Sequence, residues 1–425
     1  MSDAYDATKA IEQTCNDLVD SYEDLAEMGA GLLATIKSTI GQLRQYKYTV
    51  HWSGSYSNPS VEYRDDPYSW WEKALIWTGG GAITEEIVDH PRQQEALDAL
   101  ADTQGIVDGA DEKFEFDAGH MRDSVASIAS HMSGWVGVSS LVSRLIFPSR
   151  ASQVPTSGDI DGWRSPSAFS TYEDNLAIQH DAHETTATSI ETMLTRDGNF
   201  VETLGDHLIV FAELQGDQNE YYAGLVAQDW APDKWSITSV IQIVGEIGTK
   251  VTQFQQLQVD EIKAVVSTLN SAVSDILQTE EQKNTINRLS EPSGQGEVGW
   301  PEPAPLSSKK GAGETSYYDL TFQTQYFKDH ITHWSDLSGD FTAPVDQAEA
   351  APAIETMFHQ FPGFMATTAS GLNSLADHIK DKALVRGKAA TKEISEILDD
   401  TIRTYVAGED LNAQQANELQ KLLDE

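Results

Sequence analysis

The stretch "IEQTCNDLVDSYEDLAEMGAGLLATIKSTIGQL", residues 11–43, decides the fold. Its apolar and small residues alternate spacings of four and three, which places them in one stripe along a helix. The stripe consists of Ile11, Cys15, Leu18, Tyr22, Leu25, Gly29, Leu32, Ile36, Thr39 and Leu43. We therefore predict a helix over about 3–46. A narrow stripe on so long a helix needs a partner helix to cover it.

The same spacing recurs further along the chain. It restarts at Val240, Val244, Ile247, Val251 and Phe254, and predicts helix to about Leu289. Later buried faces are marked by Leu372, Leu375, Ile379, Ile394, Leu398, Ile402 and Tyr405. We find no sustained period-two alternation that would indicate strands. The predicted fold class is all-α, with elongated helical hairpins or bundles of long helices and a smaller C-terminal helical unit.

Composition divides the chain into four predicted segments. Residues 290–316 are rich in Pro, Gly and Ser and lack periodicity, so we read them as a linker. Residues 1–100 hold the first long helix and a Trp-rich loop, 101–289 a central helical hairpin or bundle, and 317–425 a C-terminal helical domain. Helix breaks are predicted near Asp197-Gly198 and between Trp230 and Trp235.

The Trp-rich loop covers about 50–84, where Pro, Gly, Asn and aromatic residues interrupt the helical pattern. Trp70, Trp71 and Trp77 are too apolar to be left in water. We therefore predict a compact loop, with a short helix near 68–77, folded over the helical bundle.

Charge limits the classes of partner. The chain has 28 Lys and Arg against 67 Asp and Glu, a net charge of −39, and no basic patch, so we expect no nucleic-acid partner. Cys15 is the only cysteine, so no internal disulfide can form. Because it lies in the apolar stripe of the first helix, we expect it to be a small core residue. The N-terminus lacks the basic and apolar regions of a cleaved secretory signal.

Catalytic and metal motifs are weak. His180 and His183, followed by Glu184, have the helical spacing of a metal pair, and His330 and His333 repeat it. Helical His-x-x-His pairs are more often exposed or capping residues than ligands. No nucleophile elbow or phosphate-binding loop is present. We therefore expect no catalytic residues, no cofactor, no bound metal and no enzymatic activity.

Three motifs remain: Trp52-Ser53-Gly54, the segment from Trp163 to Tyr172, and Tyr405 with Glu409. Together they resemble the WXG superfamily and the associated substrates of type VII (ESX) secretion. Trp52-Ser53-Gly54 matches the family tripeptide, with Trp52 and Gly54 as its defining residues, but no amphipathic second helix follows. We expect Trp52 to seal the end of the first long helix. The segment from Trp163 to Tyr172 resembles the family's hairpin turn better, through Trp163, Ser165, Ala168 and Tyr172, although Ser165 replaces the family glycine.

Tyr405 and Glu409 match the family's YxxxD/E export signal near the C-terminus. A tyrosine and an acid four residues apart share one helix face, so a secretion ATPase or chaperone could read both. The resemblance implies a non-enzymatic, secreted, acidic helical protein that needs no cleaved signal. Such a protein would work as an effector by protein–protein interaction, assembling with a helical partner or with itself.

Two other functions stay open. An α-helical pore-forming toxin could insert the apolar segment "GWVGVSSLVSRLIF", residues 134–147, although Arg144 and the acidic surface fit a membrane partner less well. An intracellular or phage-associated coiled-coil scaffold would be cytoplasmic instead.

Overall fold

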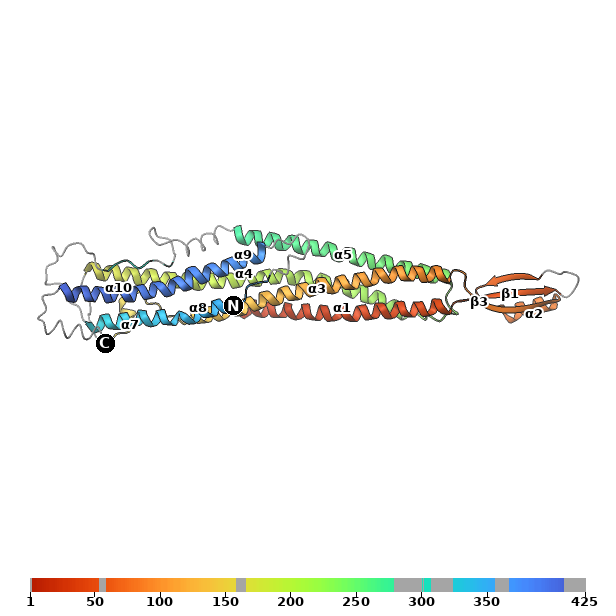
Figure 1. Ribbon diagram of the computed structural model, residues 1–425, viewed down its shortest axis with the longest axis horizontal. Coiled ribbons are helices and arrows are strands. Elements are labelled where there is room, and N and C mark those ends of the chain that lie inside the picture. The colour runs from red at the N-terminus through yellow and green to blue at the C-terminus, as the bar shows by residue number, and fades with distance from the viewer. Residues whose placement is uncertain are drawn as a thin grey trace. The chain divides into compact units, whose positions relative to one another are not determined.

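The computed structural model describes residues 2–52, 59–157, 166–278, 300, 302–306, 324–355 and 367–408 (Figure 1). Its long helices are α1 (Ser2–Gln42), α3 (Gln93–Val142), α4 (Pro166–Val226) and α5 (Ile237–Gln278). The shorter helical elements are α2 (Trp70–Thr78), η1 (Ala151–Gln153), α7 (Thr324–Asp340), α8 (Thr342–Ala350), α9 (Thr367–His378), the π-helical η3 (Ile379–Val385) and α10 (Arg386–Gly408). The strands are β1 (Arg44–Trp52), β2 (Ser60–Arg64) and β3 (Gly81–Asp89).

The chain forms two compact units, and each is assembled from distant segments. Unit 1 comprises Met1–Glu12, Asp123–Leu204 and Val266–Glu425, and unit 2 comprises Gln13–Arg122 and Gly205–Val265. The long helices therefore run from one unit into the other. The division into the predicted segments 1–100, 101–289, 290–316 and 317–425 stays a prediction. Most of the predicted linker 290–316 lies outside the described residues.

The first stripe forms the core of unit 2 as its spacing predicts. Cys15 and Leu18 are buried, as are the later members Tyr22, Leu25, Leu32, Ile36, Thr39 and Leu43. A Cβ atom added at Gly29 would lie 3.1 Å from the Tyr222 ring, so the missing side chain lets α4 approach α1 closely. The rings of Tyr22 and Phe114 stack 5.2 Å apart between α1 and α3.

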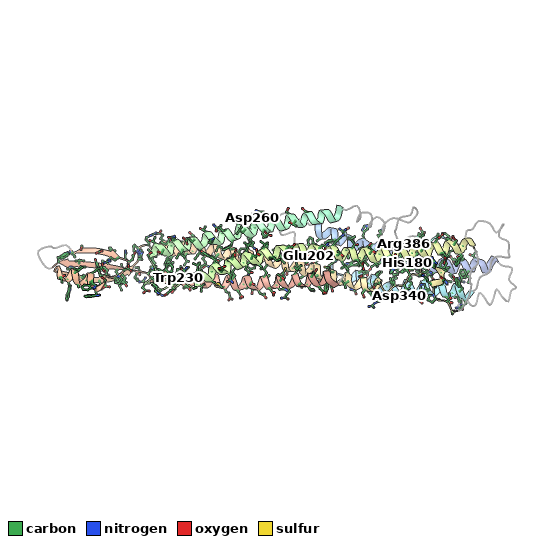
Figure 2. All side chains as sticks on the ribbon, turned by 180° about the vertical axis from the view of Figure 1, so that it is seen from behind. His180, Glu202, Trp230, Asp260, Asp340 and Arg386 are labelled. Carbon is green, nitrogen blue, oxygen red and sulfur yellow. The ribbon has the colours of Figure 1, made fainter. Side chains whose placement is uncertain are left out.

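The predicted helix break between Trp230 and Trp235 is confirmed, because α4 ends at Val226 and α5 begins at Ile237. The two indoles stack with centroids 4.7 Å apart, and Thr39 donates a hydrogen bond to the Trp230 carbonyl at 2.9 Å. Trp230 is labelled in Figure 2. This turn therefore joins the α4–α5 connection to α1.

The prediction of a purely all-α fold is wrong for residues 44–89, although the chain is mostly helical. A three-stranded antiparallel sheet has the order β2-β1-β3, with Tyr48 opposite both Glu62 and Glu85. We call this segment, Arg44–Asp89 with α2, the sheet lobe. The first helix ends at Gln42, before its predicted end, because a period-two pattern replaces the helical one: Tyr46, Tyr48, Val50 and Trp52 share one face of β1.

Unit 1 has an aromatic core that includes part of the predicted linker. Trp300, Trp334, Phe341 and Phe147 are buried together, with ring centroids 5.5 to 6.1 Å from Phe147. Their edge-to-face contacts stabilise beyond area burial alone. The described part of the linker is therefore packed into this unit.

The C-terminal faces are buried as their spacing predicts: Leu372, Leu375, Ile379, Ile394, Leu398 and Ile402. The predicted break near Asp197-Gly198 is wrong, because α4 continues through it. Asp197 is instead fully buried, and its carboxyl lies 3.8 Å from His131 on α3.

Candidate functional site

Helix α2 begins with a capping box. Ser69 Oγ accepts a hydrogen bond from the Glu72 backbone N–H at 3.4 Å, and the Glu72 carboxylate accepts one from the Ser69 N–H at 2.8 Å. These contacts satisfy backbone donors that a helix start leaves free. They also lower the pKa of the Glu72 carboxyl, and Arg64 adds to the effect. The predicted short helix is thus confirmed.

The polar side of α2 faces the sheet. Glu72 pairs with Arg64 of β2 at 3.1 Å, and Lys73 pairs with Glu85 of β3 at 3.0 Å. Ile76 lies between them on the same side and packs at the start of β3. Ile76 and the two ion pairs therefore hold the helix on the sheet.

Two glycines allow α2 to fold back onto the sheet. Gly80 has a φ of 84°, a left-handed conformation that favours glycine. A Cβ atom added at Gly81 would lie 2.8 Å from Ile76 Cγ2. The connection between α2 and β3 therefore depends on glycine at both positions.

The opposite side of α2 presents tryptophans to solvent. Trp70, Trp71, Leu75 and Trp77 are 66%, 65%, 70% and 76% exposed, and we call them the tryptophan face. Trp70 and Trp77 lie two turns apart, and Leu75 lies one turn after Trp71, so the four occupy one side of the helix. The rings of Trp70 and Trp71 stack 4.0 Å apart. The prediction that these tryptophans fold over the bundle is wrong.

Trp52, the first residue of the literal Trp-Ser-Gly motif, lies beside the end of α2. Trp52, at the end of β1, is 49% exposed, and its ring lies 3.4 Å from a Cβ atom added at Gly79, just after α2. Trp52 therefore ends a strand and does not seal the first helix, contrary to the sequence-based expectation. Gly54 lies outside the described residues.

The cations of the sheet lobe are all paired among its described residues. Besides the two pairs at α2, Arg44 contacts Asp89 at 2.8 Å and Lys47 contacts Glu86 at 3.1 Å. Asp65 contacts His90, and Glu62 accepts a hydrogen bond from the Tyr68 hydroxyl. The lobe therefore offers an anionic partner no unpaired Lys or Arg in its described part.

The hairpin-turn motif from Trp163 to Tyr172 lies partly outside the described residues, which omit Trp163 and Ser165. Ala168 and Tyr172 are buried in α4. The Tyr172 hydroxyl accepts a hydrogen bond from Trp334 Nε1 at 3.0 Å and lies 2.6 Å from His330 Nδ1. Tyr172 is thus a core residue between α4 and α7, and the hairpin turn stays a prediction.

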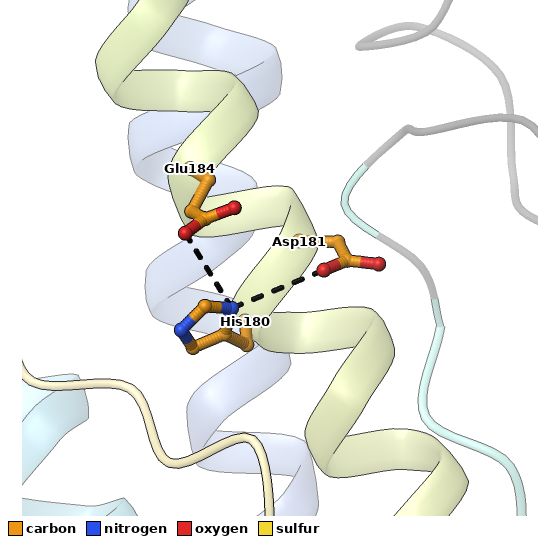
Figure 3. Close-up of side chains that lie close together, drawn as sticks. All are labelled: His180, Asp181 and Glu184. Atoms are coloured by element: carbon orange, nitrogen blue, oxygen red, sulfur yellow. Dashed lines mark ion pairs between the residues drawn. The ribbon is translucent and has the colours of Figure 1, made fainter.

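His180 and His183 have different neighbours. His183 Nε2 lies 3.0 Å from the Val142 carbonyl, and its ring stacks on Phe147 at 4.7 Å. His180 instead neighbours two acids of its own helix, Asp181 and Glu184, at 3.9 and 4.0 Å (Figure 3). Both acids are exposed, as is common for acids without an ion.

His330 and His333 pack against aromatic rings of unit 1, His330 on Tyr326 and His333 on Trp334. The Nδ1 atom of His330 is occupied by the Tyr172 hydroxyl. Burial lowers the pKa of His330 to about 4 and also lowers that of His333. Both imidazoles are therefore neutral at pH 7.

The export motif stays a prediction. Tyr405 lies in α10, whereas Glu409 lies outside the described residues.

The apolar segment 134–147 is mainly core. Trp135, Val138, Val142, Leu145 and Phe147 are buried. Helix α3 is the one helix in the described part of the chain that is long and apolar enough to cross a membrane, and half of its most apolar window is buried in the protein. A core helix of a soluble protein has the same properties.

Comparison with known proteins finds no matching family model, no matching curated protein and no matching solved structure. The resemblance to type VII substrates therefore rests on the sequence motifs alone.

Proposed function

We propose that this protein is a non-enzymatic binding protein that docks through the tryptophan face of its sheet lobe. One observation carries the proposal: α2 turns its charged side toward the sheet and its tryptophans toward solvent. A surface helix normally does the reverse. Contiguous exposed apolar surface is typical of sites that bind a partner.

The free energy available from covering these tryptophans supports a binding role. A fully covered tryptophan buries roughly 150–250 Å², so covering the exposed part of one on this face would contribute about 3 kcal/mol. The ion pairs and the capping box hold α2 in place before binding. Docking would therefore require little ordering of the helix, which favours affinity.

The test replaces the three tryptophans together, as Trp70→Ser, Trp71→Ser and Trp77→Ser, in the full chain. In unclarified extracts of producing cells, we expect part of the wild-type protein to sediment with larger assemblies or membranes. The triple variant should sediment as a free chain, because it lacks the apolar docking surface. Sucrose-gradient sedimentation with immunodetection measures the difference.

The matched control is Ile146→Ser, which removes a 76% exposed apolar side chain outside the sheet lobe. This control should sediment like the wild type. A triple variant that sediments like the wild type would show that the tryptophan face is not the docking surface.

A further inference from the structure

We infer that the tryptophan face binds the interfacial region of a zwitterionic lipid bilayer, such as one of phosphatidylcholine. The inference rests on the proposed docking function and names its partner.

Composition points first to a bilayer. Three of the four residues of the face are tryptophans. Tryptophan is enriched at membrane–water interfaces, because its ring is apolar while its indole N–H can hydrogen-bond to headgroups and water. Helix α2 has nine residues, so it is too short to span a bilayer but suited to lie along its surface.

Charge then selects the lipid. The lobe's four Lys and Arg residues each pair with an acid of the lobe, whereas Asp66 adds a further exposed negative charge. The chain as a whole has a net charge of −39. Anionic headgroups would therefore be repelled, while headgroups without net charge would not.

The same charges make a protein partner the less favoured occupant. The rim of a protein interface supplies polar and charged groups that set register and orientation. Next to the tryptophan face, Arg64, Glu72, Lys73 and Glu85 are engaged with one another. The face offers apolar area without unpaired cations, which fits a fluid interface.

The experiment is vesicle flotation of the full chain. Vesicles of pure phosphatidylcholine are compared with vesicles in which part of the lipid is phosphatidylglycerol. We expect wild-type protein to float with phosphatidylcholine and to bind about tenfold less of the anionic vesicles at low salt. Phosphatidylcholine brominated near the headgroup end of its acyl chains should quench tryptophan fluorescence.

The triple Trp→Ser variant should lose at least about tenfold in binding to phosphatidylcholine. Leu75→Ser should lose less binding to phosphatidylcholine, because it removes only one side chain of the face. The Leu75 side chain is 70% exposed, so this substitution should not disturb the folding of α2. The Ile146→Ser control should float like the wild type. Circular dichroism verifies that each variant keeps its helix content.

Two results would overturn the inference in different ways. If wild-type protein does not float, but sedimentation velocity shows self-association that the triple variant loses, the face binds a second copy and only the lipid assignment fails. If the triple variant floats and self-associates like the wild type, both this inference and the proposed function fail.

Discussion

Tyr172 links α4 to α7 through one buried hydroxyl group. That hydroxyl accepts a hydrogen bond from Trp334 Nε1, and its own hydrogen can be shared with His330 Nδ1, which lies 2.6 Å away. Burial raises the pKa of Tyr172 well above its ordinary range, so the phenol keeps this hydrogen. Tyr172 therefore joins two side chains of α7 through one neutral hydroxyl group.

Tyr172→Phe should destabilise unit 1 by about 2–4 kcal/mol, because two buried polar groups lose their partner. Urea unfolding, followed by near-ultraviolet circular dichroism, measures the loss. Tyr326→Phe is the matched control, since its ring lies 4.2 Å from the same imidazole but its hydroxyl is not in this linkage. Equal losses in the two variants would mean that packing, and not the hydroxyl, stabilises the site.

At the scale of elements, α2 depends on its surroundings. Nine residues are too few for a stable isolated helix in water. The capping box, Ile76 and the ion pairs with β2 and β3 compensate. The exposed tryptophans are therefore displayed by contacts made on the other side of the helix.

Ser69→Ala should weaken the start of α2 by about 1 kcal/mol, because the Glu72 N–H loses its acceptor. Amide hydrogen exchange in the first turn of α2 should become about fivefold faster. Thr78→Ala, which removes a hydrogen bond to the Leu75 carbonyl at the other end, is the control and should leave the first turn unchanged. Unchanged exchange in Ser69→Ala would show that the cap contributes little.

The sequence predicts elements best where one local period decides them. The stripe from Cys15 to Leu43 and the set from Val240 to Val251 are buried as their spacing requires. The strands were missed although Tyr46, Tyr48, Val50 and Trp52 alternate, because charged and polar residues between them resemble a loop. The local sequence cannot predict which side of α2 faces the sheet, since this depends on Arg64 and Glu85 from other elements.

At the scale of the whole molecule, unit 1 contains buried histidines and a buried aspartate, and their ionisation changes its stability in opposite directions as pH changes. Burial lowers the pKa of His131, His183, His330 and His333, so the stability that their neutral forms contribute is lost as pH falls below about 6.5. For His330 this loss extends down to about pH 4. Burial raises the pKa of Asp197 to about 8, so its neutral form favours the folded state, and this contribution is lost as pH rises from about 4 to 8.

Asp197→Asn should remove the ionisation that opposes folding at high pH. The variant should unfold at a higher urea concentration than the wild type at pH 8, and the difference should shrink toward pH 4. In the wild type, protonation of Asp197 partly offsets the loss of stability that the histidines cause below pH 6.5. Without Asp197, the variant should lose stability more steeply than the wild type in this range. Urea titrations of both proteins across this range measure the effect. A difference that does not change with pH would contradict the raised pKa of Asp197.

The discontinuous make-up of the two units sets an order on folding during synthesis. Unit 2 needs residues up to 265, because Thr39 of α1 bonds to the carbonyl of Trp230, 191 positions later. Unit 1 also needs segments beyond residue 266, although its first residues emerge at the start. The apolar stripe of α1 is therefore exposed on the nascent chain until the residues that cover it have been synthesised. Nascent chains of this protein are expected to depend on chaperones, and unit 2 closes before unit 1.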